Sequence, residues 1–370
     1  MERGKGMSRV KTDMERQDSS SEPQRVSLKD IAKELGISQT AVSFAINDKP
    51  GVSRRTKRRV KDAAARLGWS PVYAAQALGS SRTMTIGFAP ARSIDAFQTE
   101  TFMLHFMAGI HASLSDHGYG LLFRPCRSLE EELTTYEDWA RRKRVDGVIL
   151  VDSLIDDPRP GRLKALGMPA VLAGGPDTHH ELPSLSIDDS KTMTTILKHL
   201  RAQGHRRIAY LSGDPKLDYS RARASAFHHF AQGNGLDSAI VKFTDFDPDE
   251  AVNQTLSLFS GTHPYTAFIY ENEILAAASL RSLNMRRSDD AAVDLPARTD
   301  ALPGIVSFED SFICQSTSPS ITAVHRDAGL YGTKVANLLL KVFDGGAVSS
   351  NRRILTPKLV IRESTARPVR

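Results

Sequence analysis

A short polar stretch near the N-terminus carries side chains that can read DNA bases. Over residues 39–46 the small apolar side chains fall on one side of a helix, and the outward side carries Gln39, Thr40, Ser43 and Phe44. Amide and hydroxyl groups can donate to and accept from base edges in the major groove. The stretch therefore predicts a helix that lies deep in that groove, because its inner side chains are small.

Positive charge is concentrated around this stretch. The first 80 residues hold 16 Lys+Arg against 9 Asp+Glu, whereas the other 290 hold 33 against 34. Six of these cations crowd one short segment: Arg54, Arg55, Lys57, Arg58, Arg59 and Lys61. A basic head on a neutral body indicates a module that binds a polyanion. On charge alone, a solvated basic surface explains the pattern equally well.

Serines and glycines mark where the helices of the head begin and end. Ser27, Ser38 and Ser53 are each placed to cap a helix, and Gly36 and Gly68 to end one. The predicted helices cover residues 28–35, 39–46 and 54–67. Two short helices joined by a tight glycine turn and braced by a third form a helix-turn-helix unit. A three-helix bundle that contacts other proteins is the alternative.

From Met84 onward, short apolar runs alternate with amphipathic stretches. The runs typical of buried strands are MTIGFA, YGLLFR, VDGVILV, PAVLAG, RRIAYLS, TAFIY and GIVSF. The helical stretches between them include residues 102–117, 190–203 and 273–286. This alternation predicts parallel sheets covered by helices, with ligands bound at the carboxyl ends of the strands. A polar stretch, 286–303, interrupts the body as an exposed insertion.

Several classes of function are disfavoured. The chain has no phosphate-binding loop, nucleophile elbow or zinc-protease motif, so we expect no enzyme, no cofactor and no metal. Cys126 and Cys314 are isolated, which argues against a disulfide framework or a zinc site, and His205 is expected to be structural. No apolar run is long enough for a membrane span, and the polar N-terminus resembles no secretory signal. A bacterial cytoplasmic, nucleoid-associated protein is expected.

The residues from Val26 onward closely resemble a known family. The head reads VSLKDIAKELGISQTAVSFAINDKPGVSRRTKRRVKDAAARLGWSP, and the body carries SIDDSKTMTTILKHLRAQGHRRIAYLSGD and YTAFIYENEILAAASLRSLNMR. These motifs resemble the LacI/GalR family of bacterial transcription regulators over about residues 26–366. The resemblance implies an all-α helix-turn-helix head and an α/β two-lobed body, like that of periplasmic binding proteins, with parallel sheets.

The resemblance also implies boundaries. Residues 1–25 are a disordered tail, 26–69 the helix-turn-helix DNA-binding domain, 70–83 a hinge helix and linker, and 84–366 the two-lobed effector-binding and dimerisation domain. The chain is expected to cross between the lobes near Asp188, Arg326 and Val348.

Family resemblance assigns roles in the head. Gln39 and Thr40 match the positions that read bases, and Phe44 stands where many members carry arginine. An aromatic ring cannot make the bidentate contact to guanine but can pack on a thymine methyl; packing against the hinge or a neighbouring helix is its alternative role. Contacts to phosphates are expected from Ser38, Thr40, Ser43 and Asn47. Leu78 matches the hinge leucine that wedges into the minor groove, or else lies in a plain linker.

In the body, Arg223 and Asn272 match positions that contact the effector in the family. Glu309 stands for the family's aspartate at a later strand end, and Phe97 could stack on a sugar face. The expected effector is a sugar or sugar derivative bound between the lobes, and it controls affinity for a near-palindromic double-stranded operator. A homodimer is expected, with a dimer face formed by residues 102–111 and the helix after Asn272.

Other functions stay open at this point. A sugar-binding protein without a regulatory role shares the body but needs an export signal and no basic head. An enzyme of the doubly wound class needs a catalytic set that the motifs do not supply. A regulator that answers to a partner protein is the more serious rival, because the head is the same. A repressor that responds to a small ligand is the expected form.

Overall fold

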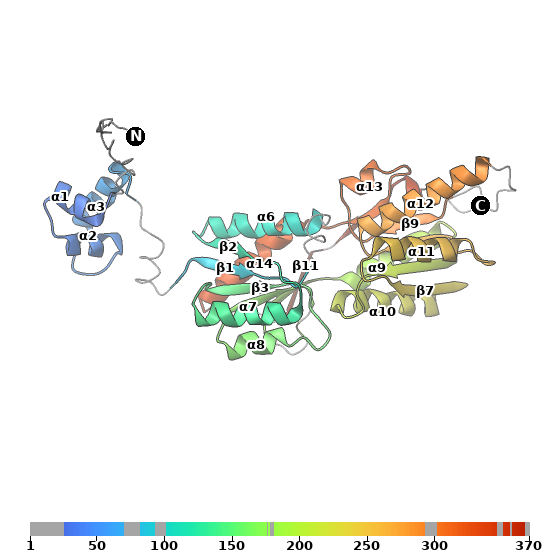
Figure 1. The fold of residues 1–370 in the computed structure, drawn as a ribbon, viewed down its shortest axis with the longest axis horizontal. Helices are drawn as coiled ribbons and strands as arrows, with labels where there is room; N and C mark the ends of the chain where they lie inside the picture. The colour runs from blue at the N-terminus through green and yellow to red at the C-terminus, as the bar shows by residue number, and fades with distance from the viewer. Residues whose placement is uncertain are drawn as a thin grey trace, which may run out of the picture. The chain divides into compact units, whose positions relative to one another are not determined.

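The computed structural model describes residues 26–69, 82–92, 101–175, 177, 181–292, 302–345, 351–355 and 357–366. For 288–292 and 351–355 only the backbone is described. The chain divides into two compact units, Met1–Gly79 and Ser80–Arg370, which we call the head and the body (Figure 1). Each is described by itself.

Three helices make up the described part of the head: α1 (Leu28–Leu35), α2 (Gln39–Ile46) and α3 (Arg54–Arg66). Ser27 forms a capping box with Asp30 at the start of α1, and the hydroxyls of Ser38 and Ser53 accept backbone N–H groups at 3.1 Å to start α2 and α3. Gly36 ends α1 with a φ of 64°, a left-handed conformation that glycine adopts without strain. The predicted helix starts and turn are confirmed.

A small apolar core holds the head together. Ile31, Val42, Ala45 and Val60 are fully buried, one or two from each helix. Because α2 contributes only valine and alanine to this core, it can lie close to its neighbours while its polar side faces outward. The helix-turn-helix architecture therefore follows from caps and a stripe of small residues.

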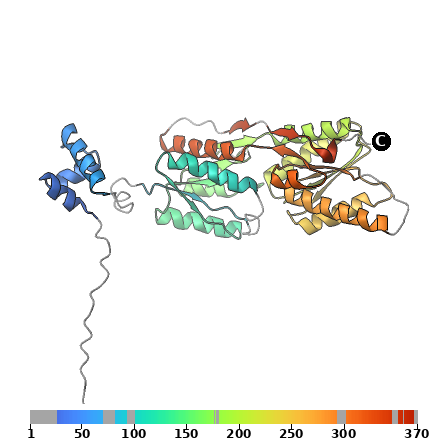
Figure 2. The same cartoon turned by 90° about the horizontal axis from the view of Figure 1, so that it is seen from above.

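The body contains two sheets, and the first belongs to the N-terminal lobe. Its strands are β1 (Thr85–Phe88), β2 (Gly120–Phe123), β3 (Gly147–Leu150), β4 (Ala170–Ala173), β5 (Ser184–Ile187) and β11 (Asn351–Leu355). They are parallel throughout, in the order β11-β5-β4-β3-β1-β2. One face is covered by α6 (Thr101–Ser115) and α14 (Ala328–Phe343), and the other by α7 (Leu129–Arg141) and α8 (Arg159–Ala165). Figure 2 shows α6 and α14 lying side by side.

The second sheet belongs to the C-terminal lobe. Its strands are β6 (Arg207–Ser212), β7 (Ser238–Phe243), β8 (Ala267–Tyr270), β9 (Gly304–Ser307), β10 (Thr322–His325) and β12 (Lys358–Val360). The order is β12-β10-β9-β8-β6-β7, and β12 alone is antiparallel to its neighbour. One face packs on α9 (Asp189–Ala202) and α10 (Asp218–Gly233), and the other on α11 (Pro248–Phe259), α12 (Glu273–Ala292) and α13 (Phe312–Ser316).

Two of the three predicted crossings between lobes are confirmed and one is wrong. The chain passes from β5 to α9 at Asp188 and from β10 to α14 at Arg326. The third crossing is not at Val348, because α14 and β11 on either side of that residue both belong to the N-terminal lobe. It follows β11 instead, between Leu355 and Lys358. The polar stretch from residue 286 is also not wholly an insertion, since α12 continues to Ala292.

In the described part of the chain, no helix is long and apolar enough to cross a membrane. Both cysteines are buried and unpaired with each other.

His205 lies buried at the start of β6, where its Nδ1 is 3.0 Å from the hydroxyl of Thr266. Burial, with a smaller effect from nearby His199, lowers the pKa of His205 to about 4. The unfolded chain takes up this proton near pH 6.5, so the folded state loses stability as the pH falls from about 6.5 to 4, by about 3 kcal/mol in all. We expect H205N to remove this part of the pH dependence of urea unfolding, whereas H228Q, at an exposed histidine on α10, should leave it unchanged.

Candidate DNA-binding surface and ligand cleft

The outward face of α2 exposes the side chains that the sequence assigns to base contacts. Gln39 and Thr40 are exposed in its first turn, and Ser43 is half-buried one turn later. Asn47 follows the helix and donates from its side-chain nitrogen to the backbone oxygen of Ser43 at 2.9 Å. Ser38 is occupied in part by capping, because its hydroxyl accepts from the backbone of Ala41. The face is thus polar, accessible and rigidly supported.

Phe44 is partly exposed and packs within the head; its contact with a thymine methyl stays a prediction. The side chain is 37% exposed, yet its ring lies beside Gly51 and 5.9 Å from Nζ of Lys49. Phe44 therefore packs on the loop that follows α2 and still presents an apolar edge outward. Leu78 and the rest of the expected hinge helix lie outside the described residues.

Cations surround this face unevenly. Arg54, Arg55, Arg58 and Arg59 are exposed at the start of α3. Lys57 instead pairs with Asp48 at 2.7 Å and also donates to the Asp48 backbone oxygen. Exposed arginines can contact phosphates, whereas Lys57 serves to hold the loop after α2.

A cleft lies between the two lobes of the body, at the carboxyl ends of the strands. It encloses about 110 Å³ and is lined by both lobes. Three arginines line it: Arg92, Arg223 and Arg326. Five carboxylates line it: Asp152, Asp189, Glu271, Glu273 and Glu309. Aromatic rings complete the walls: Phe102, Phe106, Tyr219, Phe246 and Tyr331. Such a mixture of rings and convergent polar groups is typical of sites for small polar ligands.

Arg223, on α10, is held by two carboxylates. Its Nε and Nη2 lie 2.8 and 2.7 Å from one oxygen of Asp189, and its Nη1 donates to Glu271 at 2.6 Å. The guanidinium also lies 4.2 Å from the ring centroid of Phe308. Although burial opposes the charged form, the two carboxylates outweigh it and raise the pKa of Arg223 above its usual range. Much of its capacity to bind an anion is therefore already used.

Glu271, directly after β8, is the centre of a buried network. Its second oxygen accepts from the hydroxyls of Tyr210 and Ser212. Burial, together with the charge of Glu271, raises the pKa of Tyr210 well above its usual range, so the phenol stays a donor. The carboxylate is 2% exposed and has several partners, as a buried charge requires.

Asn272 and Glu273 follow Glu271 at the start of α12. The side-chain oxygen of Asn272 accepts the backbone N–H of Leu275 at 3.0 Å and so caps this helix. That leaves its amide nitrogen to face the cleft. Glu273 is 1% exposed and accepts a hydrogen bond from the hydroxyl of Thr101 at 2.9 Å. Since Thr101 belongs to α6 in the other lobe, this bond joins the two lobes.

Arg326, at the second crossing, faces Glu309. Its Nη2 contacts the Glu309 carboxylate, and its guanidinium lies 4.7 Å from the ring of Phe102. Burial and the nearby charge of Arg223 lower the pKa of Arg326 to about 10. Its Nε is buried and has no hydrogen-bond partner among the described residues. Arg223 is thus paired with two carboxylates, whereas Arg326 has one and keeps a nitrogen without a partner among the described residues.

The N-terminal lobe closes the other side of the cleft. Arg92, after β1, pairs with Asp152, after β3. Gly174, after β4, lines the cavity with a φ of 123°, where an added Cβ would meet no atom within 4 Å. Space for a side chain is therefore present at this corner, but the backbone conformation favours glycine.

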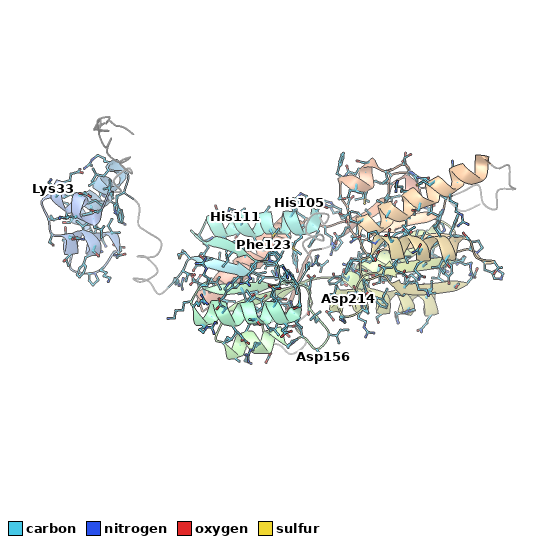
Figure 3. All side chains as sticks on the ribbon, in the orientation of Figure 1. Lys33, His105, His111, Phe123, Asp156 and Asp214 are labelled. Carbon is cyan, nitrogen blue, oxygen red and sulfur yellow. The ribbon has the colours of Figure 1, made fainter. Side chains whose placement is uncertain are left out.

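Two loops also join the lobes by backbone hydrogen bonds. Ile155 N–H donates to Lys216 O at 3.1 Å, and Asp218 N–H donates to Ser153 O at 2.9 Å. Figure 3 labels Asp156 and Asp214 on these loops and shows them on the facing sides of the two lobes. The state described is therefore one in which the lobes are in contact.

The structure brings Arg223, Asn272 and Glu309 to one cavity, and their contacts with an effector stay a prediction. Phe97 lies outside the described residues, so its position stays a prediction. Three residues of the cleft were not predicted from the sequence: Glu271, Asp189 in its role as a partner of an arginine, and Arg326 as part of the lining. Glu271 had one available signal, since it directly follows a buried apolar strand.

The chain matches two family models. Residues 27–72 match the model of bacterial regulatory proteins of the lacI family, and residues 197–365 match a periplasmic binding protein-like domain. The chain belongs to the LacI family. The head match covers the three helices. The second match covers the C-terminal lobe from within α9 onward, together with α14 and β11 of the N-terminal lobe.

Relatives agree along nearly the whole chain. The HTH-type transcriptional regulator CelR of Thermobifida fusca is 27% identical over 348 residues, covering 92% of this chain and 98% of the relative. A solved transcriptional regulator CelR–cellobiose complex is 26% identical, with a TM-score of 0.67 over 92% of this chain and all of that chain. A lac repressor dimer bound to operator shares the fold, with 23% identity and a TM-score of 0.75 over 92% of this chain and 99% of that chain. These relatives are transcriptional regulators, and one of them binds a sugar.

Proposed function

We propose that this LacI-family protein is a sequence-specific transcriptional repressor whose affinity for its operator is set by a small polar ligand in the cleft. The observation that carries the proposal is the joining, in one chain, of an exposed polar recognition face on α2 to a two-lobed cleft. Neither part alone separates a regulator from a protein contact module or a solute carrier.

On the DNA side, we assign base reading to Gln39 and Thr40, with Phe44 packing on a thymine methyl. Ser38, Ser43, Asn47 and the exposed arginines of α3 supply phosphate contacts. Capping and packing fix these side chains on a rigid helix, which supports a defined register on the duplex.

On the ligand side, we assign contacts to Arg223, Asn272 and Glu309, with Phe97 as a stacking residue at the entrance. The ligand is a carbohydrate or a carbohydrate derivative. Support comes from the aromatic and polar lining and from the cellobiose named for the related CelR complex. Ligand binding acts by changing how the lobes contact each other, since both lobes line the cavity.

The protein acts as a homodimer on a near-palindromic operator, within the bacterial cytoplasm at the nucleoid. Two observations support the dimer. The helix α6 leaves Leu104 61% exposed, and α12 leaves Met285 54% exposed. Figure 3 labels His105 and His111 on α6, and both are exposed, so this side of the helix is uncovered within one copy.

Selection of bound sequences from random DNA, at stated salt near physiological, tests the proposal. The expected result is a palindrome with a flexible central step, whose genomic matches would point to candidate ligands. Binding without any enriched sequence, with and without a library of sugars, would refute a sequence-specific regulator.

The hinge assignment makes a separate prediction. L78A should weaken binding to the selected operator by about tenfold or more, because a wedge repays its unstacking cost only on the bent specific site. Binding to unrelated DNA should change little, as it depends on phosphate contacts. Equal losses on both DNAs, measured by fluorescence anisotropy, would show that Leu78 is not a wedge.

A regulator that answers to a partner protein is the second candidate, favoured by the uncovered apolar residues of the body. It predicts that no small molecule shifts operator affinity. The cleft with its paired charges favours the ligand-responsive form.

A further inference from the structure

The cleft carries an excess of negative charge. Five carboxylates and three arginines line it, and no lysine or histidine does so among the residues described. Arg92 pairs with Asp152, Arg223 pairs with Asp189 and Glu271 together, and Arg326 pairs with Glu309. Each of the three arginines thus pairs with at least one carboxylate, whereas Glu273 pairs with none of them.

Glu273 has no cation beside it in the described part of the chain. Its only hydrogen-bond partner there is the hydroxyl of Thr101, at 2.9 Å from Oε1. A carboxylate that is 1% exposed is costly without a positive partner. Glu273 therefore lines a cavity in which a cation would be stabilised.

The remaining unsatisfied groups are donors suited to oxygen atoms. Asn272 uses its side-chain oxygen to cap α12, so its amide nitrogen is the group left for a ligand. Arg326 lines the same cavity with a buried Nε that has no partner in the described residues. Hydroxyl and ring oxygens of a ligand accept from such donors. The site is therefore suited to a ligand that carries one positive group and several oxygen atoms.

We propose that the ligand is a polyhydroxylated amine, such as an amino sugar, whose ammonium group sits against Glu273. The proposal rests on the proposed function and narrows its ligand class. Sugar phosphates and sugar acids are rejected, because Arg223 is already neutralised by two carboxylates and a further anion meets a net negative wall. Neutral sugars bind more weakly than their amine analogues.

Matched sets of probes test this with the full-length protein: glucosamine, glucose and glucuronate, and the same three forms of galactose. Titration calorimetry at pH 7 should give amine members at least about tenfold tighter than neutral ones, as close buried charge pairs do. The acids should not bind. Equal affinity for amine and neutral members, preference for an acid, or binding of none of the six would each overturn the proposal.

The matched variants are E273Q and T101A. E273Q should abolish the preference for the amine while keeping the affinity for the neutral sugar, and should not lower the melting temperature of the ligand-free protein. T101A removes the hydrogen bond between Thr101 and Glu273 but keeps the charge, so the preference should survive. If E273Q destabilises the protein and keeps the preference, Glu273 is only a brace between the lobes. Operator binding, measured separately, tells whether the proposed function fails as well.

Discussion

Replacing Arg223 by alanine should lower the free energy of unfolding of the body by about 3–5 kcal/mol. The reason is that Arg223 is 3% exposed and is the partner of both Asp189 and Glu271. Without it, the two carboxylates lose the arginine that pairs with both of them in a buried site. Denaturant unfolding of the full chain, followed by a signal from the body, measures the change.

Two comparisons separate this effect from a general one. R221A, on the same helix but at an exposed arginine, should cost at most about 0.5 kcal/mol. The double variant R223A/E271Q should be more stable than R223A by about 1 kcal/mol or more, because one of the stranded charges is removed. If R223A and R221A unfold alike, the ion pairs contribute nothing to stability.

This prediction bears on how the ligand site is tested. If R223A alone lost its response to the ligand, two causes could not be separated: the loss of a contact to the ligand, and the disruption of the cleft around Asp189 and Glu271. R223K keeps the charge but gives up the planar fork that holds Asp189 and Glu271 together. The test needs a variant that stays folded and loses only the response to the ligand. R223A/E271Q suits it better than R223A or R223K, because it leaves one fewer buried charge without its partner.

The head was predictable from sequence because its signals are local. Ser27, Ser38 and Ser53 each cap a helix within three residues of themselves, and Gly36 turns the chain at the next position. A capping hydroxyl and a left-handed glycine need no knowledge of distant residues. The outward position of Phe44 was predicted for the same reason, whereas its packing beside Gly51 was not, since the alternative considered was packing against the hinge or a neighbouring helix.

In the body, apolar runs predicted seven of the described strands (β1, β2, β3, β4, β6, β8 and β9) but not β5, β7, β10, β11 or β12. Strands such as β3 and β8 are buried on every residue, and each reads as an unbroken apolar run. By contrast β7, SAIVKF, lies at a sheet edge and is only half-buried, so its pattern is mixed. The crossing after β11 was misplaced because nothing in the local sequence says which sheet a strand joins.

The cleft was predictable only in part. Arg223, Asn272 and Glu309 were assigned by resemblance, and they line one cavity. Their partners were not, because Asp189 and Glu271 lie 34 and 48 positions away from Arg223. Which carboxylate meets which arginine depends on how sheets and helices pack, and no periodicity in the sequence records that.

Arg159 should be the second most sensitive position of the body. It is 2% exposed and joins Glu132 at 3.0 Å to Asp157 at 2.6 Å. Tyr136 donates to the same Glu132, whose pKa is raised by burial against the opposing effect of Arg159. R159M keeps the volume but leaves two buried carboxylates, so we expect a loss of about 3–5 kcal/mol. R162M is the control, because Arg162 lies on the same helix as Arg159 but forms an exposed ion pair, with Glu137 of α7. It should lower the free energy of unfolding by at most about 1 kcal/mol.

The consequence reaches the cleft because Arg159 also holds a loop that joins the lobes. Its Nη2 donates to the backbone oxygen of Asp152 at 2.7 Å, at the start of the loop whose Ser153 and Ile155 bond to the other lobe. Adding E132Q to R159M removes one stranded charge and should restore about 1 kcal/mol or more, but not the contact with Asp152. The double variant should therefore regain stability while amide hydrogen exchange at Ile155 and Asp218 stays faster than in the parent protein. Exchange that returns to the parent rate would mean that the loop is held by its own backbone bonds, without Arg159.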